Sequence, residues 1–154
     1  MLHPVSLPVL GWRECVALPE LGITEIRAKV DTGARSSALH VEAFETRLRG
    51  GCEWVRFVLG EDCRSGRHWA EARVLDRRQV TDSGGHRKER VFIRTTLRLG
   101  DAEWPIDMNL SWRPRMLFPM LLGRTAIAGR FVVDPLRSYA LGAPLANPDR
   151  PAVA

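Results

Sequence analysis

The chain has 154 residues, of which 45% are apolar and 27% are charged. These proportions are those of a globular domain and argue against an intrinsically disordered chain. A chain of this length buries roughly 68–70% of the surface that its unfolded form exposes, which is enough for one hydrophobic core without disulfides.

The net charge is +5, but the 23 basic residues are spread along the chain, and only Lys29 and Lys88 among them are lysine. A nucleic-acid-binding face would gather basic residues into a patch, so this distribution argues against nucleic-acid binding as the main role. No segment approaches the ~18 apolar residues of a membrane span. Residues 1–15 lack the basic and apolar regions of a signal peptide. We therefore expect a cytoplasmic protein that does not enter a membrane.

The three cysteines, Cys15, Cys52 and Cys63, are an odd number with gaps of 37 and 11 residues. This spacing fits neither a disulfide framework nor a zinc site of the C-x2-C kind. We expect all three to be reduced thiols.

Apolar residues alternate with polar ones at a period of two in several segments, which is typical of strands in an antiparallel sheet with one buried face. In chain order the predicted buried faces are Ile26, Ala28 and Val30; Val55, Phe57 and Leu59; Leu97 and Leu99; and Trp104, Ile106, Met108 and Leu110. Turns rich in glycine and proline separate these strands at the spacing of a barrel or sandwich. One short helical turn is predicted, at Thr125 to Ala128. The sequence therefore predicts an all-β fold.

A single domain is expected over residues 1–139. From Ala140 onward the chain has three prolines and almost no bulky apolar residue, so residues 140–154 are predicted to form a loose tail. His40 is expected to be a hydrogen-bonded strand residue. All five tryptophans are expected in the core or in a cleft wall: Trp12, Trp54, Trp69, Trp104 and Trp112.

The most informative segment is KVDTGARSSALH, in which an amphipathic strand runs directly into Asp31, Thr32, Gly33 and Ala34. Gly33 allows a tight turn whose backbone amides face the Asp31 carboxylate, and the Thr32 hydroxyl can bond across to a symmetric partner loop. Such a loop can hold two aspartates close enough to share one proton. The alternative is a structural carboxylate that ends a strand and caps a turn.

These residues resemble the single-domain, retropepsin-like aspartic peptidases. More closely, the chain is similar to the bacterial family often labelled ATP-dependent zinc proteases and now described as retropepsin-like. The segments that carry the resemblance are Gly11 to Ile23, Lys29 to His40, Trp54 to Phe57, Arg90 to Ile93 and Pro119 to Arg124. The resemblance implies a closed antiparallel barrel with one short helix.

A second signature element of this family corresponds to Leu122, Gly123 and Arg124. In such enzymes this strand runs behind the catalytic loop, the glycine is small so that the chains pack closely, and a short helix follows. The arginine of viral retropepsins pairs with a carboxylate just after the DTGA segment, where this chain has Arg35 and Ser36 instead. We expect a structural role for Arg124, with a partner that the sequence does not identify.

A second triplet of the same kind occurs at Asp82, Ser83 and Gly84. No apolar strand leads into it, and too little chain separates it from Asp31 for a complete second lobe. We interpret this triplet, with Gly85, as a hairpin tip that is a candidate flap over the cleft.

The family label would imply zinc and ATP, but the residues predict neither. The four histidines are scattered without an HExxH pair, and no GxxxxGK(S/T) loop is present. We expect no metal and no cofactor.

The resemblance implies an aspartic-type endopeptidase that acts on a peptide or protein substrate. Because one chain offers one catalytic aspartate, Asp31, and the mechanism needs two, we expect a homodimer. Two alternatives remain open. One is a non-catalytic peptide-binding or regulatory module linked to ribosomal-protein modification, which the resemblance also suggests. The other is a basic RNA- or ribosome-binding protein.

Overall fold

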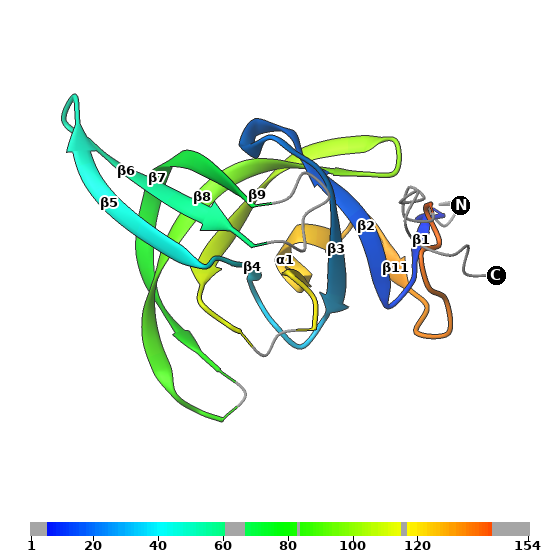
Figure 1. Cartoon of the computed structure of the whole chain (residues 1–154). Coiled ribbons are helices and arrows are strands. Elements are labelled where there is room, and N and C mark those ends of the chain that lie inside the picture. Colours follow the sequence, from blue (N-terminus) through cyan, green and yellow to red (C-terminus); the bar gives the residue numbers. More distant parts are fainter. Residues whose placement is uncertain (1–5, 61–66, 83, 115–116, 143–154) are drawn as a thin grey trace, which may run out of the picture.

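The computed structural model describes residues 6–60, 67–82, 84–114 and 117–142. Within this part of the chain the regular structure is almost entirely β (Figure 1). The elements in chain order are β1 (Val9–Leu10), β2 (Arg13–Leu18), the 3-10 turn η1 (Pro19–Leu21), β3 (Ile23–Asp31), β4 (Ser37–His40), β5 (Ala43–Arg49), β6 (Cys52–Leu59), β7 (His68–Thr81), β8 (Arg87–Leu99), β9 (Ala102–Ser111), β10 (Met120–Gly123), α1 (Arg124–Ile127) and β11 (Val132–Val133). The predicted all-β class with one short helix is confirmed. The helix begins one residue before the predicted Thr125.

Nine strands form one sheet in the order β2-β3-β10-β4-β9-β8-β7-β6-β5, and a further pair between Ala17 and Arg98 joins β2 to β8. This pair closes six of the strands into a ring, in the order β2, β3, β10, β4, β9 and β8. The ring is not the antiparallel barrel that was predicted, because β10 runs parallel to β3 and β4 runs parallel to β9. The reason is topological: β10 lies between β3 and β4, which point in opposite directions, so it must be parallel to one of them.

The predicted buried faces are confirmed. All residues named for these faces are at most 9% exposed, and they all belong to one hydrophobic core cluster. Asn109 lies on the opposite face of β9, which the alternation pattern would leave in solvent, yet it is only 3% exposed. Its side-chain amide donates to the Ser37 carbonyl at 3.0 Å, and its oxygen accepts from the Ser111 hydroxyl at 2.7 Å. These bonds satisfy a buried polar group that the alternation pattern could not locate.

The strands β5, β6 and β7 continue the sheet beyond the ring as an arm (Figure 1). A two-glycine turn, Gly50 and Gly51, joins β5 to β6, and both glycines have positive φ angles of 59° and 79°. The other long hairpin joins β7 to β8. Every residue of β5 is exposed, so none of its side chains belongs to the buried core.

The end of the described chain is anchored by the buried side chain of Glu14 on β2, which is 0% exposed. Its two carboxylate oxygens accept hydrogen bonds from the backbone amides of Ala140 and Leu141, both at 2.9 Å. The attachment of the chain to the domain thus extends two residues into the stretch predicted as a loose tail. Residues 143–154 lie outside the described residues.

The tryptophans were expected in the core or in a cleft wall; Trp104 is in the core, whereas Trp69 and Trp112 are not. Trp104 is 5% exposed and donates from Nε1 to the Ala126 carbonyl at 2.9 Å. Trp69 and Trp112 are 52% and 61% exposed. Trp69 lies on the arm, where the Arg56 guanidinium stacks on it at 4.4 Å and no hydrophobic layer covers it.

Two of the cysteines, Cys15 and Cys52, are free, as expected, and Cys63 lies outside the described residues. Burial, followed by the negative charge of Glu25, raises the pKa of Cys15 to about 12. A thiol with such a pKa is a poor nucleophile at neutral pH.

Candidate active site

Asp31 is the last residue of β3, and its carboxylate is held by its own loop. The Oδ1 atom accepts hydrogen bonds from the backbone amides of Gly33 at 3.0 Å and Ala34 at 3.2 Å. A Cβ at position 33 would lie 3.2 Å from this oxygen, so glycine lets the loop approach the carboxylate closely. The carboxylate is half-buried and Thr32 is exposed, so the group is fixed in orientation yet remains accessible.

The predicted second element lies directly beside this loop. β10 pairs in parallel with β3, with Gly123 opposite Asp31, and its other edge pairs with β4. A Cβ on Gly123 would lie 2.4 Å from the carbonyl carbon and 2.5 Å from the carbonyl oxygen of Ser36. Its amide donates to the hydroxyl of the fully buried Ser37 at 3.0 Å. Only glycine allows the two backbones to approach this closely.

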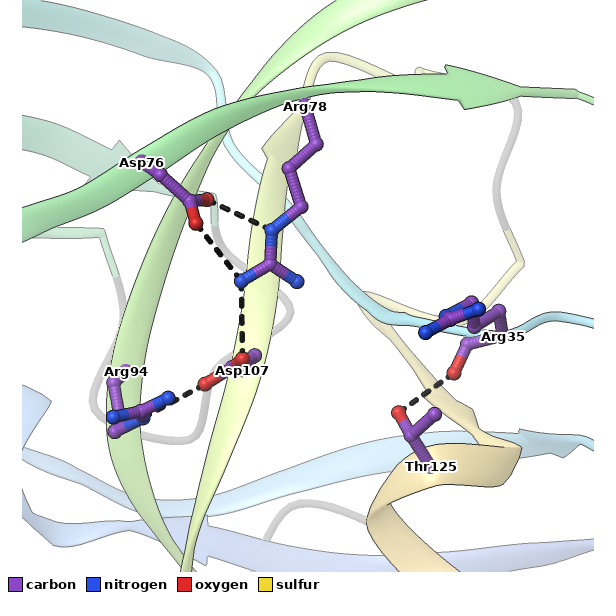
Figure 2. A network of polar contacts seen from close by, with 6 residues as sticks. All are labelled: Arg35, Asp76, Arg78, Arg94, Asp107 and Thr125. Atoms are coloured by element: carbon purple, nitrogen blue, oxygen red, sulfur yellow. Dashed lines mark hydrogen bonds and ion pairs between the residues drawn. The ribbon is translucent and has the colours of Figure 1, made fainter.

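The start of α1 completes the support of the loop. The backbone amides of Arg124 and Thr125 donate to the carbonyls of Ala34 and Arg35 at 2.8 and 3.2 Å. The Thr125 hydroxyl also donates to the Arg35 carbonyl at 2.7 Å (Figure 2). The Arg124 guanidinium donates to the Gly33 carbonyl at 3.2 Å, which identifies the partner that the sequence left open. The loop after Asp31 is therefore held by four hydrogen bonds from a segment some 90 residues away.

The strand register places Asp31 on the face of the sheet that points away from the core. Directly paired residues share a face, as do residues two apart on one strand. A row of paired residues crosses five strands on this face: Lys29, Leu121, Ala38, Asn109 and Phe92. A second row lies two residues further along each strand, in the same direction. It contains Asp31 on β3, Asp107 on β9 and Arg94 on β8.

Asp107 is the centre of an ionic network on β7, β8 and β9 (Figure 2). Arg94 donates to Asp107 at 2.9 Å, and Arg78 donates to Asp107 at 3.2 Å and to Asp76 at 2.8 Å. Arg78 also stacks on the buried ring of Phe92 at 4.4 Å. Burial disfavours the charged form of Asp107, but the hydrogen bonds from Arg94 and Arg78 outweigh burial and lower its pKa. Sequence reasoning missed this network, because the alternating charges are visible in the sequence but their pairing depends on the register.

The second triplet forms the tip of the β7–β8 hairpin, as predicted. The Asp82 amide donates to the His86 carbonyl at 2.9 Å, and Gly85 has a positive φ of 82°. The Asp82 Oδ1 atom accepts from the backbone amides of Gly84 and His86, each at 2.9 Å. These two hydrogen bonds lower the pKa of Asp82, and the one from His86 has the larger effect. Ser83 lies outside the described residues, and the role of the tip as a flap remains a prediction.

His40 has a structural role. His40 accepts a hydrogen bond at Nδ1 from the Arg113 amide at 2.8 Å, as expected for a strand histidine.

Among residues 6–60, 67–82, 84–114 and 117–142, no three His, Cys, Asp or Glu side chains gather in a way that could hold a metal ion. No helix in the same residues is both long and apolar enough to span a bilayer.

Residues 9–143 match the RimB-like family, described as "Retropepsin-like aspartic endopeptidase RimB". Curated relatives named "Probable alpha-L-glutamate ligase" include a protein of Desulfotalea psychrophila that is 38% identical over 92% of this chain and 31% of its own length. Relatives of the same name in Shewanella pealeana and Parasynechococcus marenigrum are 36% and 38% identical over 87% of this chain and 30% and 29% of their own lengths. The chain thus spans about a third of these relatives.

A solved structure with a similar fold comes from Legionella pneumophila and is titled as a protein of unknown function. It is 28% identical, with a TM-score of 0.74 over 87% of this chain and 98% of its own.

Proposed function

This chain belongs to the RimB-like family of retropepsin-like aspartic endopeptidases, and we propose that it hydrolyses peptide bonds with the Asp31 carboxylate. The observation that carries this proposal is the construction of the Asp31 loop. The carboxylate is oriented by two amides of its own loop, and the loop is held from behind by Gly123 and Arg124. A structural turn would not need such support from a distant segment.

The proposed chemistry uses two Asp31 carboxylates, one from each subunit of a homodimer. Two carboxylates about 3 Å apart cannot both ionise, so the pair holds one proton, as in aspartic proteases generally. The ionised member takes a proton from a water between the pair, and the water oxygen attacks the scissile carbonyl. The protonated member donates a hydrogen bond to the carbonyl oxygen. In the proposed dimer the exposed Thr32 would form a hydrogen bond across the two-fold axis.

For the substrate, we propose an acidic peptide that contains glutamate residues joined by ordinary α-peptide bonds. The names of the relatives support this choice, because they describe a ligase of α-L-glutamate.

The experiment compares wild type with Asp31→Asn on a glutamate-rich peptide and on the same peptide with glutamine in place of glutamate, with products identified by mass spectrometry. Cleavage of the glutamate peptide by wild type alone is the expected result. Adding an excess of Asp31→Asn chains should then poison wild type, because most wild-type subunits would sit in heterodimers with one carboxylate. Unchanged cleavage per wild-type chain, while subunits demonstrably exchange, would contradict the shared pair.

A second candidate function is a non-catalytic peptide-binding module that acts with a ligase. The ligase names of the relatives favour it, since the matching region is only about 30% of those proteins. This module would bind the glutamate peptide equally well with Asp31 or with Asn at that position and would cleave it in neither form. Calorimetry with both variants therefore separates the two functions.

A further inference from the structure

The outermost strand of the arm, β5, leaves one edge of the sheet open. It is the last strand in the sheet order and pairs only with β6 among the described residues. Its seven residues, Ala43–Arg49, contain neither proline nor glycine, and all are exposed. The unpaired amides and carbonyls of such an edge are a template for another strand.

One face of β5 extends the hydrophobic core outward. Phe44 and Thr46 are paired with Phe57 and Val55 of β6, which are both 0% exposed and belong to the core cluster. Leu48 follows on the same face. Phe44 is 46% exposed and Leu48 is 79% exposed, so the apolar row that begins in the core ends uncovered at the edge.

The other face of β5 carries Glu45, Arg47 and Arg49. Arg49 is engaged, since it forms an ion pair with Glu71 at 2.7 Å and stacks on Trp54 at 4.0 Å. Glu45 and Arg47, by contrast, form no ion pair with any residue that the structure describes. In the register of the sheet Glu45 lies opposite Arg56 of β6 and Arg47 lies opposite Trp54, so this face of the edge strand presents one acidic and one basic side chain two residues apart.

We propose that β5 binds β5 of a second copy of this chain, antiparallel and with the two-fold axis at Thr46. In this register Glu45 lies opposite Arg47 of the partner subunit, and the symmetry repeats this pair. Phe44 lies opposite Leu48 of the partner subunit, so the exposed apolar row is continued by apolar side chains. The open edge, the uncovered apolar residues and the unpaired charges are all satisfied by one isologous contact.

Charge selects this register over its neighbours. The two β5 strands can slip past each other only by two residues at a time, because outward amides must stay opposite outward carbonyls. Each such slip moves the two-fold axis by one residue. An axis at Glu45 would place the two Glu45 side chains opposite each other. An axis at Arg47 would do the same for the two Arg47 side chains. Like charges directly opposite are destabilising, and of these three axes only the one at Thr46 avoids both arrangements.

This surface is separate from the Asp31 loop, because β5 and β3 lie at different ends of the sheet order (Figure 1). The proposal therefore holds whether or not the chain is a peptidase. It commits to a second copy of this chain because β5 is complementary to itself in charge and in apolar pattern.

Cysteine cross-linking tests the register directly. In the proposed contact the two Thr46 side chains face each other, with Cα atoms within the ~7 Å that a disulfide allows. Thr46→Cys should form a covalent dimer under mild oxidation with copper phenanthroline. Leu48→Cys is the matched control, because its two copies would be about 13 Å apart, four residue steps along the strands. Cross-linking of Leu48→Cys as fast as Thr46→Cys, or no dimer from Thr46→Cys beyond the wild-type level, overturns the proposal.

A charge-swap cycle tests the ion pairs in solution. Glu45→Arg would oppose Arg47 of the partner subunit, and we expect the dissociation constant of the β5 contact, measured by sedimentation, to rise at least about tenfold. The double variant Glu45→Arg with Arg47→Glu should restore the wild-type value, because the pairs return with exchanged signs. Asp101→Arg, which changes the net charge equally on the exposed β8–β9 turn, should have no effect. Failure of the double variant to recover, or an equal effect of Asp101→Arg, contradicts the proposal and favours a different partner for this edge.

Discussion

The chain contains two loops of the pattern Asp-Ser/Thr-Gly, and their local structures are similar. In each loop the aspartate Oδ1 atom accepts a hydrogen bond from the amide of the glycine two residues later, at 3.0 Å for Asp31 and 2.9 Å for Asp82. A second amide contributes in both cases, from Ala34 and from His86. The triplet alone therefore determines how the carboxylate is tied to its own turn.

The two loops differ in what lies behind them. The Asp31 loop is backed by β10, with Gly123 against the Ser36 backbone, and is held by the first residues of α1. The Asp82 loop is a hairpin tip whose described residues are all exposed. In this chain the motif therefore forms a candidate site only where a distant segment fixes the loop against the domain.

The largest expected effect separates the two aspartates by activity. Asp31→Asn should lower the rate of peptide cleavage at least about a hundredfold, because the proposed general base is lost. Asp82→Asn should leave the rate unchanged. The fold should survive both changes, since the Asn side-chain oxygen can accept the same backbone bonds. Cleavage rates and circular dichroism of both variants check this. Loss of cleavage in Asp82→Asn would indicate that Asp31 and Asp82 of one chain form the catalytic pair.

The next effect separates the two loops by packing. Gly123→Ala should lower the free energy of unfolding by about 1–3 kcal/mol, because the new methyl group would meet the Ser36 backbone at 2.4 Å. Gly84→Ala should cost much less, since its nearest neighbour is the flexible His86 side chain at 3.1 Å. Urea unfolding of both variants measures the difference. Equal losses would mean that the Asp31 loop has room to shift.

A smaller effect concerns the hydroxyl that holds the loop. Thr125→Val keeps the shape of the side chain but removes the bond to the Arg35 carbonyl (Figure 2), and we expect a loss of about 0.5–1.5 kcal/mol. Thr81→Val, beside the hairpin tip, is the matched control and should be nearly neutral. Thermal unfolding of the pair distinguishes them, and a larger loss in Thr81→Val would reverse the ranking of the two regions.

The smallest effect is electrostatic and belongs to the hairpin. The backbone bonds from His86 and Gly84 hold the pKa of Asp82 below its ordinary value of ~3.9. The ionised carboxylate therefore favours the folded state above that ordinary value, and its contribution is lost as the pH falls through the lowered pKa. The stability difference between wild type and Asp82→Asn should shrink on acidification across this window. A carboxyl titration by NMR with a midpoint at or above ~3.9 would contradict this account.

Most of the local structure could be predicted from the sequence. The period of two located the buried faces of the strands, such as Ile26, Ala28 and Val30 on β3, because burial on one side of a sheet imposes this alternation. Glycine pairs located the turns, and the segment around Asp31 indicated a strand that ends in a carboxylate. The family resemblance, which the match over residues 9–143 confirms, depended on the same short segments.

The contacts between distant segments could not be predicted in this way. The sequence did not reveal that β10 runs parallel to β3, that the partner of Arg124 is the Gly33 carbonyl, or that Glu14 binds the amides of Ala140 and Leu141. Nor did it distinguish the exposed Trp69 of the arm from the buried Trp104 of the ring. Local pattern records which face of a strand avoids water, and so the sequence by itself determined the strands, the turns and the Asp31 carboxylate. Which strand lies beside which depends on the closure of the sheet over the whole chain, and so only the tertiary structure decided the support of that carboxylate and the open edge at β5.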